Sequence, residues 1–325
     1  MDRHNLSQII VKTIIFQLIT RTIAFVGIAD PKDEFAFKKV FATLPSKPTN
    51  ESSKSSEVVA KLLNDIINLT NENKIESLYI CPRKKSADTN KEYEVILDYC
   101  AQDKSGKELI ISIELLENTE MQIGETEAFK KRSQLIMSRA YSAQTPNYEI
   151  LKPLYFLVLC KENLFLEKNR EKKIISWYSL QEKDLSAKDL NDMHITFFEI
   201  AKCPDFTKLE EMKNDVDLWC LFFKQPSILF DEKIYKELNT KVPIMKTAFK
   251  KLEMLNWSLD DMETYEHLQK QKEDWINFKI LEFEKGQAKM LDNLRKAHPE
   301  YNTTDISRVT GLSEEEVLKY CKRKK

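Results

Sequence analysis

Residues 93–116 read YEVILDYCAQDKSGKELIISIELL, and this stretch predicts a β-hairpin. Tyr93, Val95 and Leu97 alternate with Glu94, Ile96 and Asp98, which predicts a strand. The segment 108–116 is apolar and rich in isoleucine, and it predicts a second strand. Between the two, residues 102–107 read QDKSGK, a run of turn-forming types. The hairpin sets the frame for the rest of the sequence.

The segments around the hairpin predict a mixed α/β sheet with flanking helices. Residues 154–160, LYFLVLC, form a continuous apolar run with the length of a central strand buried on both faces. Residues 125–144 have helical periodicity, and after about residue 217 the pattern is helical. The other expected elements are helices at 33–41 and 57–69, strands at 174–180 and 195–200, and helices at 216–224, 244–255, 259–291 and from 313 onward.

Composition and charge exclude several classes of function. The 325-residue chain has 51 Lys and Arg against 52 Asp and Glu, so its net charge of -1 provides no global attraction to nucleic acid or anionic lipid. Its 42% hydrophobic residues exclude global disorder. There are 5 glycines and neither a GxGxxG nor a GxxxxGK[ST] motif. We therefore expect no nucleotide cofactor.

The cysteines and the N-terminal segment give information about the cellular location of the protein. The six cysteines are scattered without a C-x-x-C pair, which favours reduced thiols and a cytoplasmic setting over a disulfide framework. Residues 9–29 are apolar, but Lys12, Gln17 and Arg21 interrupt the run. Each central Lys or Arg costs about 2.5–3.5 kcal/mol on membrane insertion. We interpret residues 1–27 as an N-terminal extension and do not expect a membrane anchor.

The hairpin carries the carboxylates that are candidates for chemistry. Asp98 ends the stretch VILD, and Glu114 and Glu120 lie on or just beyond the partner strand. Two neighbouring strand acids suit Mg²⁺, which takes one or two carboxylates and fills its other positions with water and phosphate. The alternative is that these acids only face solvent.

Several stretches, in order, resemble the Rpn-type recombination-promoting nucleases, also called putative transposases, a branch of the PD-(D/E)XK nuclease superfamily. The similarity runs from residue 28 to the end of the chain. The stretches that carry it are IADPKDEFAFKKVF at 28–41, EMQ at 120–122, FKKR at 129–132, AYS at 140–142 with Gln144, Trp257-Ser258 with Tyr265, and VTGLS at 309–313.

This resemblance implies a restriction-endonuclease-like PD-(D/E)XK domain at residues 28–225 and a helical C-terminal region at 226–325. It implies a DNA endonuclease that serves recombination or transposition, with DNA as partner and a homodimer as a possible assembly. Asp98 and Glu120 would hold Mg²⁺, or Mn²⁺ in its place, and Gln122 would orient the attacking water or a phosphate oxygen.

The spacing leaves a second register open. Asp98 and Glu120 lie about eight residues further apart than the resemblance implies, as if the segment 112–119 contained an insertion that must bulge. A strand running straight through IISIEL would instead use Glu114 and put Leu116 where Gln or Lys belongs. Because Leu116 cannot bind water or phosphate, this second register allows a catalytically degenerate relative that only binds DNA or a protein.

Four polar residues are expected to contact the DNA backbone. Arg132 and Gln144 belong to the resemblance and lie on the helix after the site, whereas Lys38 and Lys39 lie on the first amphipathic helix. Each is also explained by a solvated helix face. Phosphate contacts of this kind position the DNA and do not select its sequence.

Overall fold

The computed structural model describes residues 27–44, 54–81, 95–116, 123–145, 147–184, 186–187, 189–315 and 317–318. The chain divides into two compact units, Met1–Trp257 and Ser258–Lys325. This division lies further along the chain than residue 225, where the sequence suggested a boundary. Within the described ranges, we find no helix with the length and apolar character needed to span a bilayer.

The first unit contains a mixed sheet, as the sequence predicts. Its strands are ordered β1-β2-β3-β4-β6-β5. The meander β1-β2-β3 is antiparallel, β3, β4 and β6 are parallel, and β5 is antiparallel to β6. The strands are β1 Ile75–Ile80, β2 Val95–Asp103, β3 Glu108–Leu116, β4 Leu154–Cys160, β5 Ile175–Ser179 and β6 Met193–Glu199.

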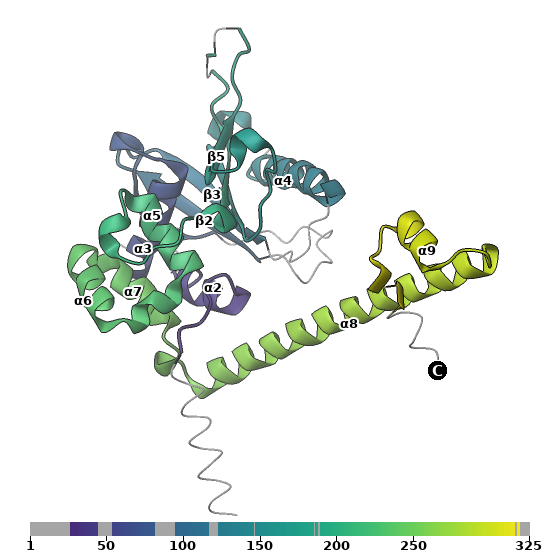
Figure 1. The fold of residues 1–325 in the computed structure, drawn as a ribbon. Helices are drawn as coiled ribbons and strands as arrows, with labels where there is room; N and C mark the ends of the chain where they lie inside the picture. Colours follow the sequence, from purple (N-terminus) through teal and green to yellow (C-terminus); the bar gives the residue numbers. More distant parts are fainter. Residues whose placement is uncertain are drawn as a thin grey trace, which may run out of the picture. The chain divides into compact units, whose positions relative to one another are not determined.

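Helix α4 (Ile123–Ser142) follows β3 in the chain and packs on one face of the sheet (Figure 1). We call this the α4 face. In each strand pair the register sets which side chains share a face, and Asp98, Ser112, Glu114 and Val158 all belong to the α4 face. Over β4 and β6 this face carries an apolar cluster that includes Phe129 of α4.

The opposite face is covered by helices from both ends of the unit (Figure 1). The Tyr99 hydroxyl donates to the Phe41 carbonyl at 2.9 Å, and the Trp177 indole donates to the Ile66 carbonyl at 2.9 Å. Trp219 is fully buried nearby and donates to the Asp65 carboxylate at 2.7 Å. The helices of this layer are α2 Glu34–Phe41, α3 Lys54–Ile67, α5 Asp215–Lys224 and α7 Pro243–Leu252, with α6 Glu232–Lys241 packed on α7.

Local sequence explains why α2 forms where the sequence predicts it. The Asp33 carboxylate accepts a hydrogen bond from the Phe35 N–H and caps the helix. Phe37, Val40 and Phe41 lie at helical spacing and are fully buried. Residues just before α2 also contact α7, because the Ala29 N–H donates to the Leu252 carbonyl at 2.9 Å.

The second unit is built on α8 (Leu259–Ala297) and α9 (Thr303–Thr310). Ser258 and Asp261 form a capping box at the start of α8. Leu291, Ile306 and Val317 form its small buried core.

Two features differ from the sequence expectations. Strand β1 and helix α6 have no counterpart among the predicted elements. Cys81, next to β1, and Cys100 of β2 form a disulfide with their Cα atoms 5.4 Å apart. The expectation that the cysteines are reduced is wrong for this pair, because the missed strand brings Cys81 beside β2.

Candidate active site

The turn of the β2-β3 hairpin fixes the pairing of its strands. The buried Asp103 carboxylate accepts hydrogen bonds from the Ser105 N–H and the Lys107 N–H, both at 2.9 Å, and from the Ser105 hydroxyl at 2.6 Å. Gly106 has φ +86°, a left-handed conformation that glycine adopts without strain. From Val95↔Leu115 to Gln102↔Glu108 the register is unbroken.

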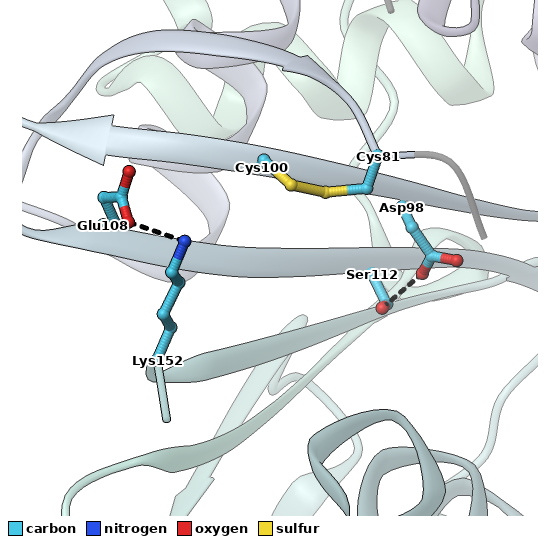
Figure 2. Close-up of a disulfide and its surroundings, with 6 residues drawn as sticks. All are labelled: Cys81, Asp98, Cys100, Glu108, Ser112 and Lys152. Atoms are coloured by element: carbon cyan, nitrogen blue, oxygen red, sulfur yellow. Dashed lines mark hydrogen bonds and ion pairs between the residues drawn. A yellow bond between two sulfur atoms is a disulfide. The ribbon is translucent and has the colours of Figure 1, made fainter. Parts of the chain in front are cut away.

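This register places Asp98 directly opposite Ser112. The Ser112 hydroxyl donates to Asp98 Oδ1 at 2.5 Å (Figure 2). Asp98 is half-buried. Burial and, after it, the negative charge of Asp98 raise the pKa of the adjacent Tyr99 well above its usual value. Asp98 is therefore an oriented carboxylate with access to solvent.

Glu114 lies two residues beyond Ser112 on the same face, diagonal to Asp98. Diagonal cross-strand neighbours have Cα atoms about 7–8 Å apart, within reach of long side chains. The Glu114 side chain is 1% exposed and pairs with the Arg132 guanidinium, which is 30% exposed. Arg132 extends from α4 and lies over the Phe129 ring at 4.9 Å.

The position two residues after Glu114 is apolar. Leu116 is 6% exposed and belongs to the cluster under α4 with Phe129 and Phe165. It offers no donor or acceptor at this place. Among the described residues, no group of three or more acidic, histidine or cysteine side chains could surround a metal ion.

The register that would use Glu120 and Gln122 depends on residues that the structure does not describe. Glu120 and Gln122 lie outside the described residues. Of the segment expected to bulge, Ser112 to Leu115 pairs with β2 without a bulge. The described geometry of the carboxylates is therefore that of Asp98 and Glu114.

The expected DNA contacts are dispersed. Lys38 pairs with Glu34, and Lys39 lies over the Phe35 and Trp257 rings at 5.5 and 5.3 Å. Both belong to α2, which packs on the face opposite Asp98. On the α4 side, Arg132 is engaged with Glu114.

Gln144 holds a neighbouring chain segment. Its amide donates to the Lys152 carbonyl at 2.9 Å and accepts from the Lys152 N–H at 3.0 Å. The Lys152 ammonium reaches Glu108 at 2.6 Å on the hairpin (Figure 2). Sequence analysis missed both Ser112 and Lys152. Ser112 could have been found by its period-two spacing from Glu114.

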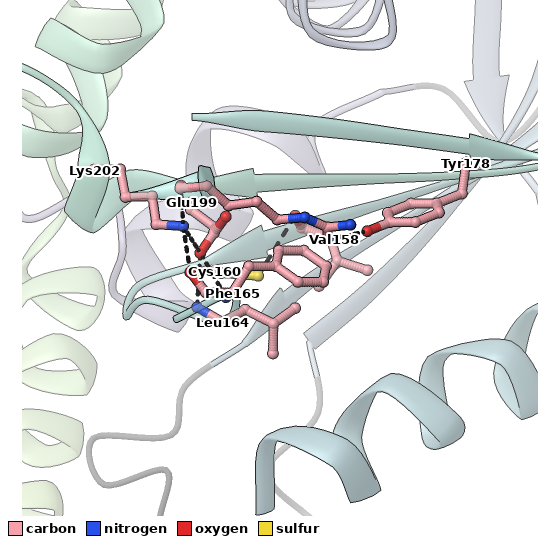
Figure 3. A network of polar contacts seen from close by, with 8 residues as sticks. Val158, Cys160, Leu164, Phe165, Tyr178, Glu199 and Lys202 are labelled. Carbon is pink, nitrogen blue, oxygen red and sulfur yellow. Dashed lines mark hydrogen bonds and ion pairs between the residues drawn. The ribbon is translucent and has the colours of Figure 1, made fainter. Parts of the chain in front are cut away.

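A second buried acid lies on the α4 face, at the end of β6. Glu199 is fully buried, and its Oε1 accepts from the Leu164 and Phe165 N–H groups at 2.8 and 3.0 Å (Figure 3). It also pairs with Lys202 at 2.8 Å, whose side chain is 4% exposed. Lys202 donates in addition to the Phe165 and Arg170 carbonyls. This network joins the end of β6 to the loop after β4.

The sheet order, with an antiparallel hairpin that carries acids beside a parallel strand reached through a helix, defines a nuclease fold of the PD-(D/E)XK type. The model of the PD-(D/E)XK nuclease family transposases matches residues 31–280, and the chain belongs to this family. Comparison with curated proteins and with solved structures gave no significant match.

Proposed function

We propose that this protein is a metal-dependent DNA endonuclease that serves recombination or transposition in the cytoplasm. The observation that carries the proposal is the juxtaposition of Asp98 and Glu114 on one sheet face, in a member of a nuclease family. We also propose that it acts as a homodimer, since one such site cuts one strand at a time.

The donor set of the hairpin fits Mg²⁺, with Mn²⁺ as a substitute. Asp98 and Glu114 supply hard carboxylate oxygens, the ligands that these ions prefer. When bound, such an ion lowers the pKa of a water molecule and polarises the scissile phosphate. Glu120 is the alternative second ligand and Gln122 the alternative water-orienting residue.

The surrounding side chains would orient the ligands and the substrate. The Ser112 hydroxyl fixes one oxygen of Asp98. Arg132 pairs with Glu114, and its side chain is 30% exposed, so its guanidinium is accessible from solvent. We infer that Arg132 also binds a phosphate oxygen of DNA.

A second candidate function has an observation in its favour. If Glu114 is the second ligand, the third site position falls on Leu116, which is buried under α4. A site without a polar group there cannot orient a water molecule from this position. The alternative is therefore a degenerate relative that binds DNA or a protein without cutting DNA.

Plasmid nicking decides among these functions. We expect wild-type protein to nick DNA with Mg²⁺ or Mn²⁺ and to stop when a chelator is added. Glu114→Gln should abolish nicking, whereas Glu120→Gln should behave as wild type; the reverse pattern would assign the second ligand to Glu120.

Wild-type protein that shifts DNA in a gel but never nicks it, at any concentration of either metal, would contradict the enzyme and establish the degenerate relative. Nicking that persists in chelator would overturn metal dependence.

A further inference from the structure

The disulfide between Cys81 and Cys100 lies next to Asp98 (Figure 2). Cys100 is two residues from Asp98 on β2, so both side chains belong to the α4 face. The backbone N–H of Cys81 donates to the Asp98 carbonyl at 2.9 Å. The disulfide therefore fastens the end of β1 to the part of β2 that carries the candidate ligand.

The surroundings distinguish this pair from the other described cysteines. Cys160, Cys203 and Cys220 are buried. Burial, and then the charges of Glu199 and Glu114, raise the pKa of Cys160 well above its usual value. A thiol with a raised pKa forms little thiolate and reacts slowly. Cys81 and Cys100 are half-buried, so of these five cysteines they are the two that a soluble thiol can approach.

A cavity opens beside Cys100. It has a volume of about 100 Å³, and Tyr79, Cys100, Glu108 and Lys152 are among its lining residues. Lys152 and Glu108 form an ion pair at 2.6 Å among these lining residues. Cys100 is therefore one of the residues that border this cavity.

We propose that Cys81 and Cys100 are a reversible redox pair whose oxidation state controls the order of the strand segment that carries Asp98, and with it metal binding. The second half of this statement rests on the proposed function. Oxidation closes the chain between the two cysteines into a loop and removes freedom from the segment that includes Asp98. Reduction removes this covalent link and leaves the backbone hydrogen bonds between β1 and β2 in place.

The reaction is thiol–disulfide exchange with a low-molecular-weight disulfide as oxidant. One cysteine loses its proton, and its thiolate attacks a sulfur of the small disulfide, which releases one small thiolate. The second cysteine thiolate then attacks the mixed disulfide and releases the other. Two electrons pass from the cysteine pair to the small disulfide, and the two protons go to the released thiolates.

The test equilibrates the full-length protein with oxidised or reduced glutathione and measures three quantities in each state. These are the number of alkylated thiols by intact mass, amide hydrogen exchange of peptides from 75–81 and 95–103, and Mn²⁺ affinity by calorimetry. We expect two more alkylated thiols in the reduced form. Exchange should be about tenfold or more slower in the oxidised form, and Mn²⁺ should bind it about tenfold more tightly.

Variants isolate the pair. In hydrogen exchange and Mn²⁺ affinity, Cys81→Ser and Cys100→Ser should each resemble reduced wild-type protein under both conditions. Cys203→Ala is the matched control, because it removes a buried thiol away from the hairpin and should keep the full response.

The outcomes separate this inference from the proposed function. A pair that does not change its oxidation state, or hydrogen exchange that is equal in both states, overturns the inference. Equal Mn²⁺ affinity in the oxidised and reduced states overturns the claim that the oxidation state of the pair controls metal binding. If exchange responds as expected but neither state binds Mn²⁺, the redox pair stands and the proposed metal-dependent function fails.

Discussion

Glu114 and Glu199 lie on the same face of one sheet, and both carboxylates are removed from solvent, yet their surroundings differ. Glu199 accepts two backbone N–H groups and pairs with Lys202, which is 4% exposed and also binds backbone carbonyls. Glu114 pairs with Arg132, which is 30% exposed and extends from a helix.

The difference separates a structural acid from a candidate catalytic one. Both glutamates are buried and paired, so neither burial nor an ion pair identifies a site. Glu114 has a second carboxylate, Asp98, diagonal to it on the neighbouring strand, whereas the strand neighbour of Glu199 is Cys160. The two neighbouring carboxylates of Asp98 and Glu114 suit a metal ion. The hydrogen bonds and ion pair of Glu199 hold a loop in place.

The largest effect is expected at the structural pair. Lys202→Met leaves the Glu199 charge buried without its cation, and it should lower the free energy of unfolding by about 3–5 kcal/mol. Urea denaturation measures this loss. Lys241→Met, which removes an exposed partner of Glu237, is the control and should be indistinguishable from wild type. Equal stability of the two variants would remove the structural role of Lys202.

The next prediction concerns Asp98, the neighbouring carboxylate that Glu114 has and Glu199 does not have. Asp98→Asn leaves Glu114 as the one carboxylate of this pair, and plasmid nicking should fall at least about 100-fold. Even the hydrogen-bond partners of metal ligands contribute about 10–100-fold to metal affinity or activity. Stability should change little because Asp98 is half-buried. Glu199→Gln, compared at equal concentrations of folded protein, should retain nicking. Undiminished nicking by Asp98→Asn would exclude Asp98 as a ligand.

Arg132→Met sharpens the comparison by combining stability with metal binding. Loss of the guanidinium leaves a buried carboxylate without its cation and should destabilise the fold by about 1–3 kcal/mol. Millimolar Mn²⁺ should recover part of this loss, because an ion that binds only the folded state stabilises it. Thermal unfolding with and without Mn²⁺ measures the recovery. Millimolar Mn²⁺ should not restore the stability of Lys202→Met. If Mn²⁺ stabilises both variants or neither, the distinction between Glu114 and Glu199 is contradicted.

The smallest effect concerns Lys251, a half-buried lysine whose ammonium group donates to neutral oxygen atoms. Lys251 donates to the Val40 carbonyl and the Thr43 hydroxyl, and burial followed by the charge of Lys39 lowers its pKa to about 8. The unfolded chain, with its usual lysine pKa near 10.5, binds more protons between pH 8 and pH 10.5, so stability should rise with pH in this window. Wild-type protein should gain about 1 kcal/mol between pH 7 and pH 9 relative to Lys251→Met. Parallel pH dependences in urea denaturation would contradict this.

Sequence periodicity was sufficient for the elements with a strong local signal. The hairpin, the buried strand β4 and helix α2 all follow from residues close in the chain. Strand β1 was missed because its pairing shifts between Ile75 and Ser77, and its buried positions do not alternate with exposed ones. Without β1, the pairing of Cys81 with Cys100 had no basis in spacing.

The placement of Asp98 and Glu114 on paired strands was predictable, whereas the side chains that contact them were not, and their role in a metal site stays a prediction. Asp98 and Glu114 follow from the strand pattern, but the choice between Glu114 and Glu120 depends on a segment outside the described residues. The Arg132–Glu114 pair joins a helix to a strand, and only tertiary packing brings them together. Gln144 was expected at DNA, whereas both ends of its amide bind the Lys152 backbone. No local pattern distinguishes these two uses of an amide.

The turn at Asp103 has a consequence for the order of folding. Its three hydrogen bonds join residues at most four positions apart, and isolated hairpins form in about 1–10 μs. We therefore expect local contacts to bring Asp98 and Glu114 together before the long-range contacts of the sheet and α4 are complete. Two carboxylates that approach in this way repel each other. Docking of α4, which brings Arg132 to Glu114, relieves the repulsion, so a late folding step neutralises a site that an early step assembles.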